Sequence, residues 1–366
     1  MDQSNTSKKC TLQDVANMAR VSVSTVSHVL NGTAKISEPT KQRVMEAVHT
    51  LRYRPLGESG SRLLRQNRKA IGVIVQDIRN EFYAACAGSV LNCADNSGYT
   101  VILCDCGYSR QREADLVREL IYQDISGLIF FGGTENAEPV TMADGYGIPV
   151  VLANRHVDGF SSVMFSNTKI IRDLITALCE AGRKRYLYLS ESPELQSIRD
   201  RIDGFCLGMM DHHIPDDSYQ ILTDKRLQRN KVDAAYTVLQ EHLRARGLDF
   251  DTVITSSDLI AIGAMKCLQD GGCRVPEDVW VVGYDDISVS SMVSPPLTTV
   301  RQNTDRLGEE AFLLLHEIMH TEHYRPKQIM IENTLVIRSS ALGNTHLKTQ
   351  IGKEGFTIWP SSTLDP

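Results

Sequence analysis

Apolar residues recur at helical spacing near the start of the chain and predict three short helices there. The predicted helices cover residues 11–19, 23–31 and 37–51. Thr11 and Asp14 form a capping-box pattern at the start of the first helix, and Ser22 offers a hydroxyl to cap the second. Because only a tight turn at residues 20–21 separates these two helices, the pattern predicts a helix-turn-helix.

The second predicted helix has an apolar face and a small, polar outer face. Its inward positions are Val26, Val29 and Leu30, and its outward positions are Val23, Ser24, Thr25, Ser27 and His28. In a helix-turn-helix the outer face of the second helix lies in the major groove, where side chains contact base edges. The alternative is a structural three-helix bundle that binds no nucleic acid.

From residue 71 onward, apolar runs alternate with amphipathic stretches. One series contains IGVIVQ, YTVILCDC, SGLIFFGG and IPVVLAN, and a second series contains RYLYLS, DTVITSS and VWVVGYDD. Continuous apolar strands separated by helices form parallel sheets that are covered on both faces. We therefore expect an α/β core of two doubly wound parallel-sheet lobes behind an N-terminal all-α helix-turn-helix domain. A long helix over 304–320 and strands within 329–340 complete the pattern.

Charge is divided unevenly along the chain. Residues 1–70 carry 12 Lys and Arg against 5 Asp and Glu, a net charge of +7, which leaves −13 for the remainder because the total is −6. A basic end on an acidic body indicates that this end binds a polyanion. The basic residues placed to contact phosphates around the second helix are Lys8, Lys9, Lys35, Lys41, Arg43, Arg52 and Arg54. This charge favours a DNA-binding unit over a structural bundle.

Composition narrows the class of protein further. The chain is 42% apolar and 23% charged, as in ordinary globular proteins, and it contains neither a long apolar span nor an N-terminal signal peptide. We expect a cytoplasmic, nucleoid-associated protein with no membrane partner. The nine cysteines include no C-x-x-C pair and are expected to be thiols. Cys104 and Cys106 are better explained as alternating strand residues than as metal ligands.

Several motifs extend along most of the chain. Near the start are D-V-A, V-S-x-x-T-V-S, V-L-N-G and Y-R-P, and further on are DIRNEFY, SSDLIAIGA, VPEDVWVVGYDD and PPLTTVRQ. Together these motifs resemble the LacI/GalR family of bacterial regulators over roughly residues 11–340. The resemblance implies a periplasmic-binding-protein-like core that binds an effector. It also places Val23 and Ser24 at the main base-reading positions, with Thr25 and Ser27 supporting them and Asn31 close to the DNA backbone. Thr11 and Ser22 are also expected to bind DNA.

Two features depart from the family pattern. His28 stands where the family usually has an arginine that pairs with a guanine, so we expect a different base preference at that position. After Pro55 the insertion LGESG precedes SRLLR, which resembles the family's hinge helix. By that resemblance Leu64 is the expected wedge in the minor groove. A flexible basic linker is the alternative for this segment.

Polar residues directly follow the apolar runs of both predicted lobes, where ligands of such sheets bind. These candidates for effector binding are Asn154, Arg155, Ser257, Asp258 and Asp285. The resemblance supports Ser257 and Asp285 and adds Arg201 and the aromatic pair Phe82 and Tyr83. Aromatic faces beside an arginine and a carboxylate suit a sugar or sugar derivative, and a nucleobase or another polar metabolite is the alternative.

Residues 316–320 spell H-E-x-x-H on a predicted helix, which is the signature of zinc proteases. The string fixes only three positions, no convincing third-ligand helix follows, and histidines at a helix C-terminus are favoured by the helix dipole. The chain also lacks a P-loop and a G-x-S-x-G elbow. We therefore expect no enzymatic activity, catalytic residue or cofactor. Incidental zinc or nickel binding by His316, His320 and His323 is more plausible than hydrolysis.

These observations predict a transcription regulator, most simply a repressor, that binds double-stranded operator DNA as a homodimer under the control of a small-molecule effector. The expected division is a DNA-binding domain (1–55), a hinge (56–70), an N-terminal lobe (71–164 with 302–322), a C-terminal lobe (165–301 with 323–341) and a tail (342–366). The tail has no leucine heptads, so a C-terminal coiled coil is not expected. A solute-binding or enzymatic α/β protein with a basic helical bundle is the alternative.

Overall fold

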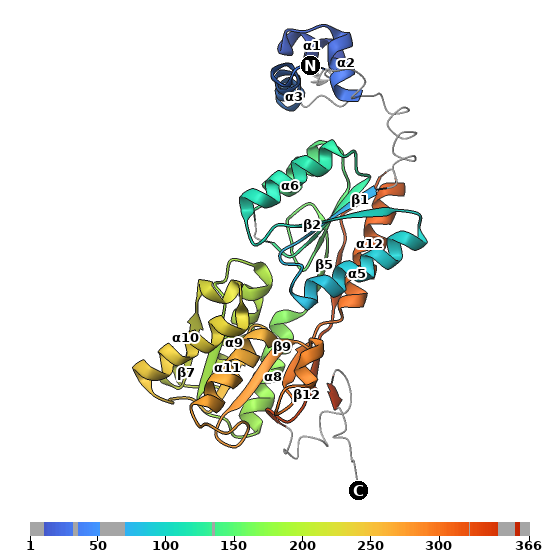
Figure 1. Ribbon diagram of the computed structural model, residues 1–366. Coiled ribbons are helices and arrows are strands. Elements are labelled where there is room, and N and C mark those ends of the chain that lie inside the picture. The colour runs from blue at the N-terminus through green and yellow to red at the C-terminus, as the bar shows by residue number, and fades with distance from the viewer. Residues whose placement is uncertain are drawn as a thin grey trace, which may run out of the picture.

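The computed structural model describes a helical headpiece and two α/β lobes (Figure 1). The described residues are 11–31, 36–51, 70–133, 136–321, 323–342 and 356–358. Leu64, the expected wedge, lies outside them, as does most of the expected hinge. The helix-turn-helix domain followed by two parallel-sheet lobes confirms the predicted fold class.

The headpiece consists of α1 (Leu12–Ala19), α2 (Val23–Asn31) and α3 (Glu38–Leu51). The predicted capping box is present at α1, because the Asp14 carboxylate accepts from the Thr11 amide at 2.7 Å and the Asp14 amide donates to the Thr11 hydroxyl at 3.3 Å. Arg20 ends α1 in the left-handed region, with φ of 56°, and so makes the sharp turn toward α2. The buried apolar core is formed by Val15, Ala16, Ala19, Val26, Val44, Ala47 and Val48.

The first lobe is built on a parallel sheet with the strand order β11-β5-β4-β3-β1-β2. Its strands are β1 (Ala70–Val75), β2 (Thr100–Asp105), β3 (Gly127–Phe131), β4 (Val150–Ala153), β5 (Ser161–Phe165) and β11 (Gln328–Ile331). Its helices are α5 (Glu81–Asn96), α6 (Arg110–Tyr122), α7 (Glu138–Gly145) and α12 (Thr304–His320). Apolar residues of α5 and α12 fill the core on one face of the sheet, and those of α6 and α7 fill it on the other.

The second lobe is built on a sheet with the strand order β13-β12-β10-β9-β8-β6-β7, in which the described strands pair in parallel except for the antiparallel pair β10 and β12. Its strands are β6 (Tyr186–Ser190), β7 (Tyr219–Thr223), β8 (Thr252–Thr255), β9 (Trp280–Asp285), β10 (Thr298–Arg301), β12 (Thr334–Ile337) and β13 (Phe356–Ile358). Helices α8 (Asn167–Glu180) and α9 (Gln196–Asp211) cover one face, and α10 (Lys231–Arg246) and α11 (Asp258–Asp270) cover the other. Short 3₁₀ turns lie at Asp216–Ser218, Lys225–Gln228 and Ser288–Ser291.

The chain returns to the first lobe after β10 and leaves it again after β11 (Figure 1). We expected residues 323–341 to belong wholly to the second lobe, and this is wrong for β11. That strand pairs in parallel with β5, and its Ile331 is buried in the core of the first lobe. Only two residues separate β11 from β12, so the sequence pattern predicts that both strands belong to one lobe. In the structure they lie in different sheets.

Helices α5 and α12 pack directly against each other in the first lobe. Gly308 makes this close approach possible, because a Cβ there would lie 2.6 Å from the Ser89 Cβ and 2.7 Å from the Cys86 carbonyl oxygen. The Ser89 hydroxyl also donates to the Asp305 carbonyl at 2.7 Å. The two helices therefore form one rigid layer.

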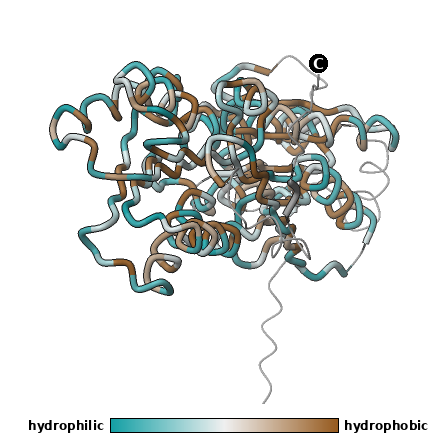
Figure 2. Tube along the Cα trace, turned by 90° about the horizontal axis from the view of Figure 1, so that it is seen from below, coloured by the Kyte–Doolittle hydropathy of each residue, from teal (hydrophilic) through white to brown (hydrophobic). Residues whose placement is uncertain are grey.

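Apolar and polar segments alternate along the helices, and apolar segments gather toward the interior of the lobes (Figure 2). This distribution is that of amphipathic helices packed on buried sheets. Among the described residues, no helix combines the length and apolarity that a membrane span requires.

Candidate functional site

The outer face of α2 has the exposure that the sequence predicted. Val23, Ser24 and His28 are exposed, with Val23 at 37%, whereas Val26 is fully buried. Thr25 and Ser27 are half-buried at the edges of this face. Asn31 is the last residue of α2, and its side chain lies outside the described part of the structure.

The hydroxyl of Ser22 caps α2 and orders the first turn of its outer face. It accepts from the Thr25 amide at 3.1 Å and lies 2.7 Å from the Thr25 hydroxyl and 2.8 Å from the Ser24 hydroxyl. This local network holds three hydroxyls together at the helix N-terminus. Backbone amides and hydroxyls in such a position are suited to a phosphate at the rim of a DNA groove.

A small void of about 20 Å³ lies between the two lobes. The first lobe lines it with Asn80, Phe82, Tyr83, Tyr108 and Asn154, and the second lobe with Glu191, Leu195, Ser197, Ile198, Arg201, Lys231, Ser256, Ser257 and Asp285. A space of this size holds roughly one water molecule. The lobes are therefore closed on the cleft, and we call this group of residues the cleft site.

The structure brings together in the cleft site most of the effector candidates taken from the sequence, namely Phe82, Tyr83, Asn154, Arg201, Ser257 and Asp285. Three buried atoms among them, Asn154 Oδ1, Arg201 Nε and Ser257 Oγ, have no hydrogen-bond partner within the described residues. Buried polar atoms are rarely left in this condition unless a ligand or water satisfies them. One donor, one acceptor and one hydroxyl without partners thus belong to residues that line the same space.

Arg155 is the first candidate that the structure does not bring to the cleft site. Its side chain is fully buried in the first lobe, where Nη1 donates to Glu113 at 2.7 Å and Nη2 to the Asn136 carbonyl at 2.5 Å. Gly133 passes directly over it, since a Cβ there would lie 2.6 Å from Nη1. Arg155 follows strand β4 as predicted, but its side chain points into the first lobe instead of the cleft site.

Asp258 is the second candidate that lies elsewhere. Its buried carboxylate accepts from the Ile287 amide at 2.9 Å, the Ser290 hydroxyl at 2.6 Å and the Thr299 hydroxyl at 2.5 Å. These bonds connect α11 to the segment that follows β9 and to strand β10. Asp258 therefore stabilises the second lobe and does not line the cleft site.

Lys231 and Glu191 are buried residues of the cleft site that were not among the candidates. The Lys231 ammonium lies 2.7 Å from the Glu191 carboxylate, which also accepts from the Ser256 hydroxyl. Glu191 comes directly after strand β6, so the rule that selected the other candidates also applies to it. Lys231 is the first residue of α10 and gives no such signal, because a lysine at a helix start is normally solvated.

Arg201 and Asp285 form the other charged group of the cleft site. Arg201 donates through Nη1 to the Ser256 carbonyl at 2.5 Å, lies 3.7 Å over the Tyr284 ring and approaches Asp285 to 3.9 Å. Asp285 accepts from the Gln302 amide at 2.6 Å. Burial raises the pKa of Asp285 to about 7, and the nearby Arg201 only partly opposes this. The carboxyl therefore changes charge near neutral pH.

This shift predicts how stability depends on pH. The folded protein holds a proton on Asp285 up to about pH 7, whereas an unfolded aspartate releases it near pH 4. Between about pH 4 and about pH 7 the folded state binds more protons, so this group's contribution to the unfolding free energy falls as pH rises through that window.

The measurement is chemical denaturation of the wild type and Asp285→Asn at about pH 5 and about pH 8. The stability of the wild type relative to Asp285→Asn is expected to be lower at the higher pH. An equal difference at both pH values would contradict the raised pKa.

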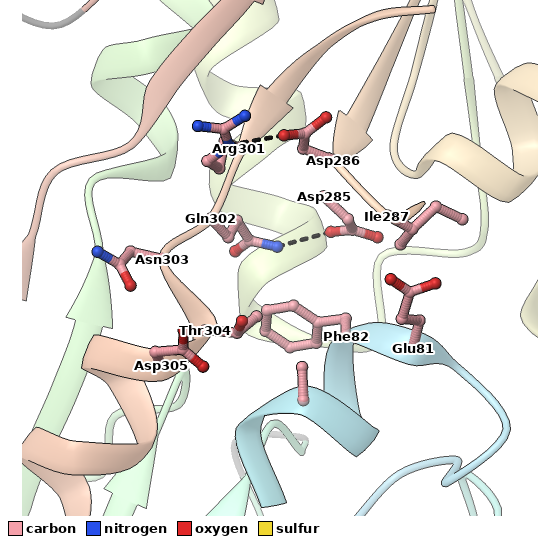
Figure 3. A pocket seen from close by; sticks show the side chains of 11 residues that line it. Glu81, Phe82, Asp285, Asp286, Ile287, Arg301, Gln302, Asn303, Thr304 and Asp305 are labelled. Atoms are coloured by element: carbon pink, nitrogen blue, oxygen red, sulfur yellow. Dashed lines mark hydrogen bonds and ion pairs between the residues drawn. The ribbon is translucent and has the colours of Figure 1, made fainter. Parts of the chain in front are cut away.

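A second, larger cavity of about 260 Å³ lies beside the junction of the lobes (Figure 3). It shares Phe82 and Asp285 with the cleft site, and its other lining residues are Glu81, Ala85, Asp286, Ile287, Arg301, Gln302, Asn303, Thr304 and Asp305. Figure 3 shows the hydrogen bond between Gln302 and Asp285 above the Phe82 ring. The cavity and the cleft site therefore adjoin at Phe82 and Asp285.

Hydrogen bonds across the cleft hold the two lobes together. The Glu81 carboxylate accepts from the Ser288 amide and hydroxyl, both at 2.8 Å. Arg229 donates to the Gly107 carbonyl at 2.5 Å, and the His156 amide donates to Gln196 at 2.8 Å. The closed arrangement therefore has its own contacts in addition to those around the central void.

Two family models match the chain. The model of bacterial regulatory proteins, lacI family, matches residues 11–55, and that of the periplasmic binding protein-like domain matches residues 175–341. The first region contains the headpiece, and the second contains most of the second lobe together with α12.

Curated relatives match over nearly their whole length. The HTH-type transcriptional repressor PurR of Vibrio parahaemolyticus is 30% identical over 340 residues, covering 90% of this chain and 98% of the relative. The HTH-type transcriptional regulator RegA of Clostridium saccharobutylicum is 30% identical over 334 residues, covering 90% and 99%. The names of both relatives describe transcription regulators.

Solved structures share the architecture. The complex of the transcriptional regulator CelR with cellobiose is 28% identical, has a TM-score of 0.66, and covers 90% of this chain and 99% of its own. The lac repressor dimer bound to operator and the anti-inducer ONPF is 24% identical, has a TM-score of 0.66, and covers 91% and 99%. The second of these similarities concerns the fold alone.

Proposed function

Since the chain belongs to the LacI family of DNA-binding transcription regulators, we propose that it is a repressor whose operator affinity is set by a sugar or sugar derivative bound in the cleft site. The effector lies between the lobes and contacts Phe82, Tyr83, Asn154, Arg201, Ser257 and Asp285. The outer face of α2 reads the operator, and two copies of the chain bind the two halves of a roughly palindromic site.

The observation that carries this proposal is the set of unpartnered polar atoms in the cleft site, Asn154 Oδ1, Arg201 Nε and Ser257 Oγ. Hydroxyl groups both donate and accept hydrogen bonds, so a polyol can satisfy all three atoms at once. Phe82 and Tyr83 lie edge to face at 5.1 Å and supply an apolar wall for the C–H surface of a sugar ring.

The charges of the cleft site support a neutral effector. Glu191 is paired with Lys231, so these two charges compensate each other, and Arg201 has a partial counter-charge in Asp285, whose pKa is about 7. A charged ligand would leave one of these groups uncompensated in a buried space. The cellobiose complex of CelR agrees with a sugar, because that regulator is 28% identical over nearly the whole chain.

The void of about 20 Å³ is too small for a sugar. Binding therefore requires the lobes to separate or rotate, which breaks cross-lobe bonds such as that between Glu81 and Ser288. Through this coupling the effector selects one arrangement of the lobes and thereby sets the operator affinity, by roughly 1–3 kcal/mol in typical allosteric proteins.

The experiment has two parts. Operator fragments are selected from random duplex DNA with the full chain, and binding is compared with a variant that lacks residues 1–60, which is expected to bind none. A thermal-shift screen of sugars and nucleobases then identifies effectors, and each hit is tested on Asp285→Ala and for its effect on operator affinity. Failure to bind DNA at low ionic strength, with and without hits, overturns the proposal. Hits confined to nucleobases overturn the assignment of the effector as a sugar.

His28 gives a separate prediction about the operator. Its exposed position on α2 faces outward with Val23 and Ser24, and a neutral imidazole offers only one donor and one acceptor. Replacing it with arginine supplies a bidentate donor pair, so His28→Arg is expected to shift base preference toward guanine at one position per half-site. A good bidentate contact discriminates by about 1–3 kcal/mol. Selection from random DNA measures this directly, and identical sequence preferences for both proteins would refute it.

A further inference from the structure

The C-terminal end of α12 carries two histidines one helical turn apart. His316 and His320 lie on the same side of the helix, with ring centroids 4.2 Å apart and planes tilted by 35°. The His320 ring is exposed, and the His316 ring is partly exposed. Residues four positions apart on a helix project side by side, which is the spacing that lets two imidazoles reach one ion.

The contacts of the two rings indicate which ring nitrogen of His320 is available to an ion. His320 Nδ1 lies 2.7 Å from the His316 carbonyl oxygen and must donate to it, which leaves the electron pair of the neutral ring on Nε2. The His316 ring packs against Tyr99 and Phe312, with centroids at 6.0 and 5.9 Å. This packing holds the His316 ring in place beside His320.

Glu317, the central residue of the H-E-x-x-H string, does not act with these histidines. Its carboxylate is paired with the Lys327 ammonium at 2.5 Å. Within the described part of the chain, no group of three or more His, Cys, Asp or Glu residues is arranged to hold a metal ion. The histidine pair thus offers two protein ligands, and the other coordination positions of an ion there fall to water.

We propose that His316 and His320 chelate one divalent first-row transition ion, of the class of Ni²⁺, Cu²⁺ or Zn²⁺, through their imidazole nitrogens. Neutral imidazoles are preferred ligands for these ions, whereas Mg²⁺ and Ca²⁺ prefer oxygen ligands. The site is independent of the cleft site, and its test does not depend on an effector.

The histidine pair lies near the start of β1, the first strand of the first lobe. Tyr99, which contacts His316, directly precedes Thr100, and Thr100 is the register partner of Ala70 at the start of β1. Figure 1 shows α12 running from the junction of the lobes to the end of the first lobe where β1 begins. The proposed ion therefore sits at the end of the lobe at which the chain arrives from the headpiece.

The test is calorimetric titration of the untagged full-length protein with Ni²⁺ alone at neutral pH. One site is expected, and His320→Ala is expected to weaken it by on the order of 100-fold, because the second ligand no longer binds intramolecularly. His316→Phe keeps the ring packing against Tyr99 and Phe312 but removes the ligand, so the same loss is expected without loss of the fold. The double variant should bind little more weakly than either single variant.

Two controls separate chelation by this pair from general binding by surface histidines. His213→Ala removes another histidine of the surface, and Glu317→Gln removes the carboxylate between the pair; both are expected to bind Ni²⁺ as the wild type does. The affinity should also fall below about pH 6, where imidazoles become protonated. Wild-type affinity in His320→Ala and in His316→Phe, or an equal loss in His213→Ala, would overturn the proposal.

Discussion

Replacing Arg201 with alanine is expected to abolish the response to the effector and to lower the unfolding free energy by about 3–5 kcal/mol. Arg201 is buried, donates to the Ser256 carbonyl, stacks on Tyr284 and lies beside Asp285. Truncation removes all of these contacts and leaves a buried carboxyl without its cationic neighbour. It also removes Arg201 Nε, one of the unpartnered atoms that the proposed effector satisfies.

Arg172 provides a matched control. It forms a 2.6 Å ion pair with Asp211, but both side chains are nearly half exposed. Exposed pairs contribute about 0–1 kcal/mol, so Arg172→Ala should leave stability and the effector response nearly unchanged. Chemical denaturation and operator binding with and without effector measure both properties. If Arg201→Ala loses no more stability than Arg172→Ala and still responds to effector, the assigned role of Arg201 is wrong.

The second large effect is expected from Lys231. Lys231→Met leaves the Glu191 carboxylate buried without a positive partner, and breaking a buried pair in this way costs about 3–5 kcal/mol. The double variant Lys231→Met with Glu191→Gln should recover most of this loss, because a neutral amide keeps a hydrogen bond to Ser256 without carrying charge.

A double-mutant cycle by chemical denaturation measures the coupling between the two side chains. Strong coupling is expected, and simple addition of the two single effects would show that the pair does not act as a unit. The comparison also bears on function, since the double variant restores charge balance but changes the hydrogen-bonding groups at the cleft site. We expect it to fold like the wild type and to bind the effector more weakly.

The headpiece could be predicted closely because its signals are local. Thr11 and Ser22 mark helix starts, and the spacing of Val15, Ala16 and Val26 identifies the buried face, all within a few residues of one another. The two lobes were predictable for a similar reason, since each βα unit repeats the same pattern of an apolar run and an amphipathic helix. The family resemblance then implied that the two lobes form a periplasmic-binding-protein-like core.

The errors in the fold lie where local pattern and long-range pairing disagree. The short helix α7 was not predicted, and it includes Pro139 near its start and Gly145 at its end, which are weak helix formers. Strand β11 pairs with β5, a partner more than 160 residues earlier, which no local periodicity can indicate.

In the cleft site, likewise, the sequence pattern predicts positions along the chain but not the direction of single side chains. A polar residue after a strand is a good indicator of position, and it correctly selected Asn154, Ser257 and Asp285 as lining residues. It could not show that Arg155 turns inward to Glu113 or that Asp258 binds Ser290 and Thr299. Those directions are set by partners far away in sequence, which become neighbours only in the folded lobe.

The contact between α5 and α12 has a mechanical consequence. The first turn of α5 carries Phe82 and Tyr83 at the cleft site, and α12 continues for 17 residues, or about 26 Å, to the opposite end of the lobe. Because Gly308 allows the two helices to pack closely, we expect α5 and α12 to move as one body. A tilt of the first lobe at the cleft site, where we propose that the effector binds, is therefore expected to displace the opposite end of the lobe, at which β1 begins.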